Sequence, residues 1–279
     1  MRVYVSGPFN GRLYRYQTDY LNSHNSNNHI YNNVEHHTSI GEGVMEFTEI
    51  QRIINSVNEE NPLVLIHGYG NDVYGDIGVF TSSFDPLHIG HEEIIHMTSR
   101  YYGIKRTFII LSKNHVLNKT CVAPLEHRIA MVMRVYGSDN RYSIFLSNDG
   151  RYVEMGHQLH LRCPDCSFYF NMGFDSFEVM ATERLSGNTL QELVKFRDTY
   201  NCHVKIVIRG MMRSRDTELV LDNNNKRDWM RSVDLFQIDD KYNYISSTLA
   251  RERLKAKRSV NNILSPTVAQ YIRDNNLYK

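Results

Sequence analysis

Two histidines three residues apart are the side chains in this sequence most suited to chemistry. His88 and His91 stand in the string FDPLHIGH, shortly after the strand-like run Ile77–Phe80. The residues between that strand and His91 are expected to form a loop, and His91 is expected to open a helix. In open parallel sheets, ligands bind beyond the carboxyl ends of strands, and helix N-termini attract phosphate. The spacing therefore predicts a phosphate site where Gly90 allows close approach. The alternative is that both histidines only cap or pack a loop.

A second group of polar residues lies late in the chain. Ser246, Ser247 and Thr248 precede a helical pattern, Leu249–Lys257, with Arg251 one turn inside it. Ser and Thr are favoured helix caps. Their hydroxyls and the free backbone N–H groups of a helix start also hold phosphate, and an arginine fork reaches the same anion. The alternative is an ordinary N-cap followed by a surface arginine.

Two further polar groups follow strand-like runs. Gly173 and Asp175 come after the apolar segment Ser167–Asn171, and Arg209 comes directly after Val204–Ile208. A carboxylate at a strand end binds ribose hydroxyls or orients hydrated magnesium, although a loop cap is an equally simple interpretation of Asp175.

Two histidine-containing segments raise the question of a bound metal. The spacing of His157, His160, Cys163 and Cys166 is compatible with a zinc site. An ordinary helix, turn and strand explains the same spacing. The histidines of the polar segment Asn22–His37 are explained more simply by a solvated loop.

The segments that carry these residues alternate between strand and helix patterns. This alternation predicts an α/β fold, a Rossmann-like open and mainly parallel sheet flanked by helices. Residues 76–279 are expected to form this domain. Residues 1–75 are expected to be an N-terminal extension of unknown role, with 21–43 as a loop or disordered segment. The other elements expected are helices at Glu92–Tyr102 and Pro124–Tyr136, a strand at Arg106–Leu111, a helix starting at Ser265-Pro266, and, within the extension, a helical pattern at 47–57 and a strand at Leu63–Ile66.

Composition excludes several classes of protein. The chain has 279 residues and a formal net charge of +1, from 32 basic and 31 acidic residues, so no overall positive field would attract nucleic acid. Its four cysteines are too few for a disulfide scaffold at this length. No signal-peptide pattern and no apolar run of about 18 residues is visible. We therefore expect a cytoplasmic protein that binds neither nucleic acid nor a membrane.

The two motifs together resemble a known family. The string that contains His88 and His91 resembles the first signature of the nucleotidyltransferase superfamily, which includes the class I aminoacyl-tRNA synthetases. It is similar in particular to the bacterial-type nicotinate/nicotinamide mononucleotide adenylyltransferases. The segment Ile245–Arg251 resembles the second signature of the same enzymes, and the resemblance extends over residues 76–279.

The resemblance implies adenylyl transfer from ATP to nicotinate or nicotinamide mononucleotide, a step of NAD biosynthesis, with Mg²⁺ held through phosphates rather than by direct side-chain ligation. The implied partners are ATP and a mononucleotide, and a homo-oligomer is left open. The implied catalytic residues are His88, His91 and Arg251. The implied ATP- and phosphate-binding residues are Ser83, Phe84, Gly90, Lys113 (with Lys119 as a second choice), Ser246, Ser247 and Thr248. The implied nucleotide-binding residues are Thr81, Ser82, Gly173, Asp175 and Arg209.

The chain departs from the family pattern at two places. Thr81 and Ser82 stand where the family usually has two glycines. The family often stacks the pyridine on a tryptophan soon after the Gly-x-Asp segment, whereas Trp229 is the only tryptophan here, which leaves Phe174 and Phe177 as candidate substitutes. The alternatives that stay open are another nucleotidyl transfer, with CTP or a phosphorylated alcohol, and a nucleotide sensor with little catalysis.

Overall fold

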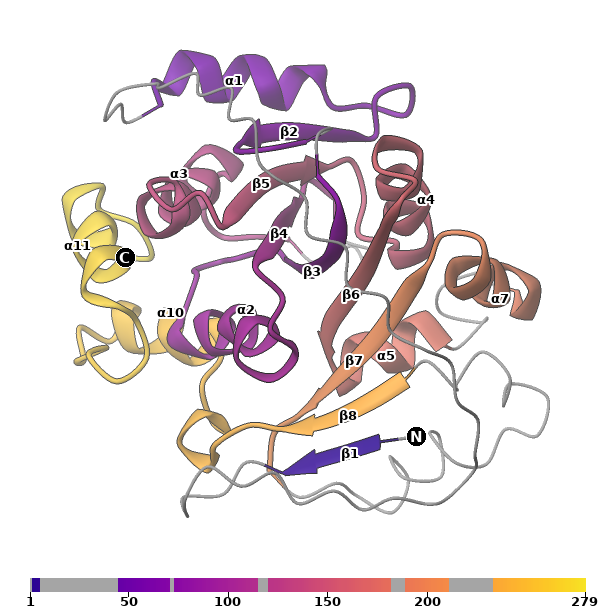
Figure 1. Ribbon diagram of the computed structural model, residues 1–279. Coiled ribbons are helices and arrows are strands. Elements are labelled where there is room, and N and C mark those ends of the chain that lie inside the picture. Colours follow the sequence, from indigo (N-terminus) through magenta and orange to yellow (C-terminus); the bar gives the residue numbers. More distant parts are fainter. Residues whose placement is uncertain (1, 6–44, 71–72, 115–119, 182–188, 211–232) are drawn as a thin grey trace.

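The computed structural model describes residues 2–5, 45–70, 73–114, 120–181, 189–210 and 233–279 (Figure 1). The segment 6–44, which holds the whole of the expected loop at 21–43, lies outside the described residues. Lys119 and Trp229 lie outside them as well.

The described strands form one sheet in the order β1-β8-β7-β6-β3-β4-β5-β2. All adjacent pairs are parallel except the last, in which β2 runs antiparallel to β5. This arrangement confirms the predicted α/β fold with a mainly parallel sheet. The strands are β1 (Arg2–Val5), β2 (Leu63–His67), β3 (Gly75–Ser82), β4 (Arg106–Ser112), β5 (Tyr142–Ser147), β6 (Cys166–Gly173), β7 (Cys202–Ile208) and β8 (Val233–Gln237).

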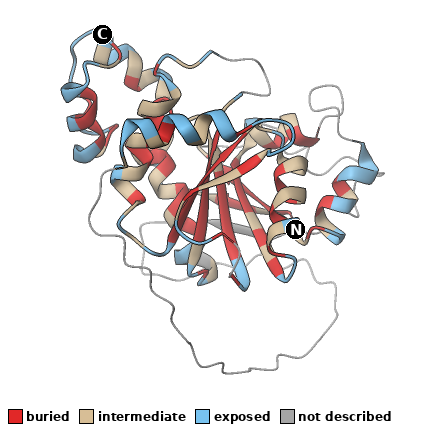
Figure 2. Cartoon of the chain, turned by 90° about the horizontal axis from the view of Figure 1, so that it is seen from above, coloured by how far each residue is buried: buried red, intermediate tan, exposed pale blue. Residues whose placement is uncertain are grey.

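Helices cover both faces of the sheet, and each face has its own hydrophobic core. Because both faces are covered, the central strands are nearly continuous apolar runs, as in Phe108–Leu111, which is fully buried. Figure 2 shows the buried strands between helices whose outer residues are exposed. One core is built with α1 (Phe47–Ser56), α2 (Ile89–Tyr102), α3 (Leu125–Tyr136), α10 (Ser247–Lys255) and α11 (Pro266–Asp274). The other is built with α4 (Tyr152–Arg162), α5 (Phe174–Ala181) and α7 (Leu190–Asp198).

The strand order reverses at β3, and this reversal positions the site. From β3 the chain continues to β4 and β5 on one side, and then returns to β6, β7 and β8 on the other side. The loops after β3 and β6 therefore diverge and leave a crevice at the carboxyl ends of these strands, where ligands bind in folds of this type.

Several element boundaries differ from the sequence prediction. Helix α10 begins at Ser247, so Ser247 and Thr248 lie in its first turn and do not precede it. Strand β3 extends to Ser82, so Thr81 and Ser82 belong to a strand end and not to a loop. Helix α2 begins at Ile89 because His88 serves as its N-cap, so His91 lies in the first turn. Pro124 is the N-cap of α3 and not its first helical residue. The last helix begins as predicted, with Ser265 as N-cap and Pro266 at the first position.

Part of the expected N-terminal extension belongs to the same sheet. Strand β2 pairs with β5, and α1 packs against α3 and β2. The boundary at 75/76 stays a prediction, but the structure shows that residues on its N-terminal side complete the sheet edge. Within the described ranges, we find no helix with the length and apolarity needed to span a bilayer.

Candidate active site

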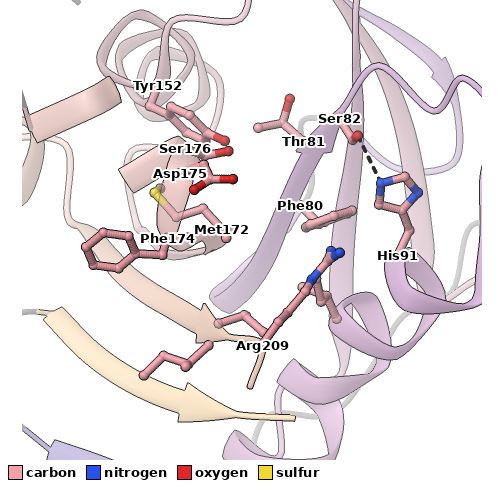
Figure 3. Close-up of a pocket in the computed structure, with 14 residues that line it drawn as sticks. Phe80, Thr81, Ser82, His91, Tyr152, Met172, Phe174, Asp175, Ser176 and Arg209 are labelled. Carbon is pink, nitrogen blue, oxygen red and sulfur yellow. Dashed lines mark hydrogen bonds between the residues drawn. The ribbon is translucent and has the colours of Figure 1, made fainter. Parts of the chain in front are cut away.

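A cavity of about 340 Å³ lies at the carboxyl ends of β3, β6 and β7, where the strand order reverses. Figure 3 shows the side chains that face it, from the end of β3 on one side and from the start of α5 on the other. The cavity brings together several residues that the sequence placed in one site: Thr81, Ser82, His91, Gly173, Asp175 and Arg209.

The two histidines are stacked on each other at the start of α2. Their ring centroids are 3.6 Å apart with an interplanar angle of 14°. The Nδ1 of His88 accepts a hydrogen bond from the backbone N–H of His91 at 3.2 Å. Nδ1 therefore carries the lone pair, and the proton of the neutral ring is on Nε2. A Cβ at Gly90 would lie 3.2 Å from the His88 ring, which is a tight contact, so a side chain at this position would press on the stacked rings.

Burial keeps both imidazoles neutral. The exposed fractions of His88 and His91 are 2% and 7%. Burial, and then the charge of Arg209, lowers the pKa of His88 to about 3. Burial, with smaller effects of His88 and Arg209, also holds the pKa of His91 well below its usual value. In this state the pair offers neutral N–H donors to an anion, rather than imidazolium charges.

The second motif contacts the first directly. Ser246 caps α10 by accepting from the N–H of Leu249 at 3.1 Å. The Ser247 hydroxyl donates to the carbonyl of Pro86 at 3.0 Å. Arg251 donates to the carbonyl of Asp85 at 2.6 Å, and also to the Thr248 hydroxyl at 3.3 Å. The two motifs, more than 150 residues apart in the chain, therefore form a single unit.

The Asp85 side chain, which the sequence analysis did not single out, joins the first motif to two distant segments of the chain. Its carboxylate is buried and accepts from the N–H groups of Val122 and Ala123 at 2.7 and 3.0 Å. It also accepts from the hydroxyl of Tyr278 at 2.8 Å. The only signal in the sequence was the position of this acidic residue inside the first motif, between Phe84 and a proline. Its hydrogen-bond partners could not be predicted, because they come from distant segments of the chain.

Arg209 and Asp175 face the cavity from the ends of β7 and β6. Arg209 donates to the carbonyl of Ile245 at 2.9 Å, which joins it to the second motif. Burial lowers the pKa of Arg209, and the nearby Asp175 carboxylate opposes that shift. Asp175 lies in the first turn of α5, beside Ser176 and opposite Thr81 (Figure 3).

The aromatic lining of the cavity was only partly predicted. Phe174 lines it, whereas Phe177 is fully buried in the core and does not. Tyr152, at the start of α4, also lines the cavity and was missed by the sequence analysis, because nothing local distinguishes it from a core aromatic. Burial raises the pKa of Tyr152, so its hydroxyl stays protonated as a donor. Phe80, Tyr152 and Phe174 are thus aromatic side chains that line the cavity.

Three of the expected phosphate-binding residues are engaged elsewhere. The Lys113 ammonium donates to the carbonyls of Ile54 and Val57 at the end of α1, at 3.0 and 2.8 Å. The carbonyl of Ser83 accepts from Arg128 at 2.8 Å, and Ser83 and Lys113 line a second cavity of about 410 Å³. Phe84 is fully buried and packs edge-on against the His91 ring, which supports the ring rather than an anion.

The zinc alternative is not supported. Cys163 and Cys166 are buried and donate to the carbonyls of Gly70 and Val73, while His157 stacks on Tyr200. Within the described ranges no three His, Cys, Asp or Glu side chains form a group that could hold a metal ion.

Comparisons with known proteins identify related sequences. Residues 79–253 match the family described as Cytidylyltransferase-like. The chain is similar to the probable nicotinate-nucleotide adenylyltransferase of Shewanella frigidimarina, with 27% identity over 221 residues, 73% of this chain and 99% of that protein. The protein with the same description from Dictyoglomus turgidum is 22% identical over 209 residues, 72% of this chain and 95% of that protein.

Solved structures show the same fold. The Plasmodium falciparum nicotinic acid mononucleotide adenylyltransferase complexed with NaAD has a TM-score of 0.53 and 19% identity, covering 74% of this chain and 98% of that chain. The same protein complexed with APC has a TM-score of 0.50 and 19% identity, with 73% and 96% covered.

Proposed function

The chain belongs to the cytidylyltransferase-like family, and from this we propose that it transfers the adenylyl group of ATP to a pyridine mononucleotide. The products are the corresponding dinucleotide, NAD or its deamido form, and pyrophosphate. The descriptions of the relatives favour nicotinate mononucleotide as the acceptor, because they are nicotinate-nucleotide adenylyltransferases and nearly their whole length is matched.

One observation carries the proposal: His91 of the first motif, Asp175 and Arg209 line a single cavity at the reversal of the strand order. The second motif does not line this cavity, but it is hydrogen-bonded to Arg209 and to the first motif. Hydrogen-bond donors suited to a phosphate, a cation and a carboxylate therefore surround a cavity of about 340 Å³. Pockets for small ligands have volumes of this order.

The chemistry needs no general base, because the attacking 5′-phosphate is already ionised. A phosphate oxygen of the mononucleotide attacks the α-phosphorus of ATP in line. The bond from that phosphorus to the bridging oxygen breaks, and pyrophosphate leaves with the bonding electrons. The protein contributes positioning and stabilisation of charge. We assign the Nε2–H groups of His88 and His91 to the reacting phosphates, and the N-terminus of α10 with Arg251 to the departing pyrophosphate.

Magnesium fits this donor set as a companion of the substrate. Asp175 is the carboxylate among the described lining residues, and Mg²⁺ is commonly held by one or two carboxylates together with substrate phosphates. We propose that Asp175 holds the hydrated ion beside the nucleotide. When bound, the ion neutralises charge on the phosphate oxygens.

We also propose that the protein acts in the cytoplasm, where thiols remain reduced, since all four cysteines are free. Assembly into a homo-oligomer stays a prediction, which light scattering of the purified protein tests.

A substrate panel tests the proposed function. Purified protein with Mg²⁺ is given ATP or CTP together with nicotinate mononucleotide, nicotinamide mononucleotide or a phosphorylated alcohol, and both pyrophosphate and the coupled product are measured. We expect turnover with ATP and a pyridine mononucleotide, and the two mononucleotides reveal the preference. Turnover only with CTP or a phosphorylated alcohol would replace this function by another nucleotidyl transfer. Nucleotide binding without any product would favour a sensor.

A further inference from the structure

Ser82, at the end of β3, makes a contact that a glycine at this position would lack. Its hydroxyl oxygen lies 3.3 Å from the Nε2 of His91, and both residues line the cavity (Figure 3). Thr81 and Ser82 are the two hydroxyl residues that stand where the resembled family usually has glycines.

Packing fixes the plane of the His91 ring but not which edge faces the cavity. The ring stacks on His88 at 3.6 Å and packs against Phe84 and Phe80 with centroid distances of 5.2 and 5.7 Å. Ring nitrogen and ring carbon have nearly the same size, so these contacts would hold a flipped ring almost equally well. A hydrogen bond must therefore determine which edge of the His91 ring faces the cavity.

Ser82 supplies that hydrogen bond. The Nδ1 of His91 is buried and has no partner among the described residues, whereas Nε2 has the Ser82 hydroxyl. A buried N–H without a partner is more costly than a buried lone pair without one. The proton of the neutral ring is therefore on Nε2, pointing towards Ser82 and the cavity.

The hydroxyl still has one group to offer. A serine oxygen has two lone pairs and one hydrogen. One lone pair accepts from Nε2–H of His91, and the other receives a long contact of 3.5 Å from the backbone N–H of Phe84. The hydroxyl hydrogen is then free to point into the cavity, so that Ser82 and His91 present two neutral donors to the same space.

We propose that Ser82 is a positioning residue, which selects the Nε2–H form and the cavity-facing edge of His91 for contact with a nucleotide phosphate. This inference rests on the proposed function for the identity of the ligand. The 3.3 Å separation is long for a hydrogen bond, so an arriving phosphate oxygen can share both donors without breaking a strong contact.

Kinetic comparison of Ser82→Ala, Ser82→Gly and Ser82→Thr tests the proposal. Loss of one hydrogen bond corresponds to a change in rate of about threefold to tenfold. We therefore expect kcat to fall by that factor in Ser82→Ala and Ser82→Gly, with KM for both substrates within about twofold. Ser82→Thr retains the hydroxyl and should restore most of the rate. Wild-type kcat in Ser82→Ala or Ser82→Gly would overturn the proposal.

A spectroscopic measurement separates positioning from a general loss of structure. With ¹⁵N-labelled histidine, long-range ¹H–¹⁵N correlations report which ring nitrogen of His91 carries the proton, and His91→Gln identifies the signals. We expect a single Nε2–H form in the wild type and a mixture in Ser82→Ala. An unchanged tautomer would overturn the proposal. Ser143→Ala, which removes a buried hydroxyl that accepts from the N–H of Tyr69, is the matched control and should leave both readouts unchanged.

The outcomes for Ser82 and for the proposed function are distinguishable. If the wild type turned over none of the substrates in the panel, the proposed function would fail, while the tautomer measurement would still decide the role of Ser82. If Ser82→Ala did not fold, as judged by its melting curve, Ser82→Gly would provide the same comparison.

Discussion

Lowering the pH from 7 to 5 is expected to destabilise the fold by about 2 kcal/mol through His88 alone. The folded protein buries this ring almost completely, and burial, followed by the charge of Arg209, lowers its pKa from 6.5 to about 3. In the unfolded chain the ring titrates near 6.5. Between pH 6.5 and about 3, the unfolded state therefore binds a proton that the folded state does not bind.

The sign and size follow from this difference. Stability rises with pH wherever the unfolded state binds more protons, so acidification below about 6.5 lowers the free energy of unfolding. Each unit by which the pH falls in that window lowers the free energy of unfolding by about 1.4 kcal/mol. The step from 6.5 to 5 covers about 1.5 units, which gives about 2 kcal/mol. The loss is complete only when the pH reaches the folded pKa, about 3.

The assay is urea unfolding at pH 7 and pH 5 of the wild type and of His88→Asn. Asparagine is a favoured N-cap, so it can still accept from the N–H of His91, but it does not titrate. All other ionisable groups are shared by the two proteins, and their contributions cancel in the comparison. We expect the wild type to lose about 2 kcal/mol more than the variant between the two pH values. An equal loss in both proteins would refute the reasoning that burial keeps His88 neutral.

Three further predictions concern other parts of the site. His91→Ala removes a donor from the reacting phosphates, so kcat should fall by at least about a hundredfold while the melting curve still shows a cooperative fold; near-normal turnover would contradict the assignment. Tyr278→Phe deletes a hydrogen bond to the buried Asp85 carboxylate, and denaturant unfolding should show a loss of about 1–2 kcal/mol. An unchanged midpoint would show that this hydrogen bond does not contribute to stability. Lys113→Met removes the cation from the carbonyls at the end of α1, so the free energy of unfolding should fall by about 1–3 kcal/mol. A raised KM for ATP at unchanged stability would instead place the ammonium on phosphate.

The fold could be predicted because its central strands are buried on both faces. Segments such as Phe108–Leu111 are then apolar throughout and are bounded by polar turns, which is a strong signal in a single sequence. Helix ends were predicted less well, because a cap is a contact of one side chain and not a pattern. His88 is an unusual N-cap, and nothing in the sequence distinguishes it from a loop residue before His91.

In the candidate site, too, the features that follow from a sequence pattern were predicted and those that depend on single contacts were not. Spacing within each motif, together with the resemblance, predicted that His91, Asp175 and Arg209 would share one site, and the structure brings them to one cavity. The contacts that hold the site were not predictable. Asp85 meets Tyr278 across 193 positions of the chain, and Lys113 meets the end of α1 across more than 50. Such pairs depend on which strands are neighbours, and a single sequence does not contain that information.

Both outer strands of the sheet come from the part of the chain that precedes the first motif: β1 lies beside β8, and β2 lies beside β5. An unpaired strand edge presents a row of free N–H and C=O groups, which is a template for pairing with another molecule. A chain that began at residue 76 would expose such an edge on β5 and on β8 at once. The full chain has sheet edges of its own on β1 and β2, but these are short strands of four and five residues, whereas the truncation would expose β5, in which all six residues are buried. The shortened protein is therefore expected to aggregate through this strand even where its cavity is complete.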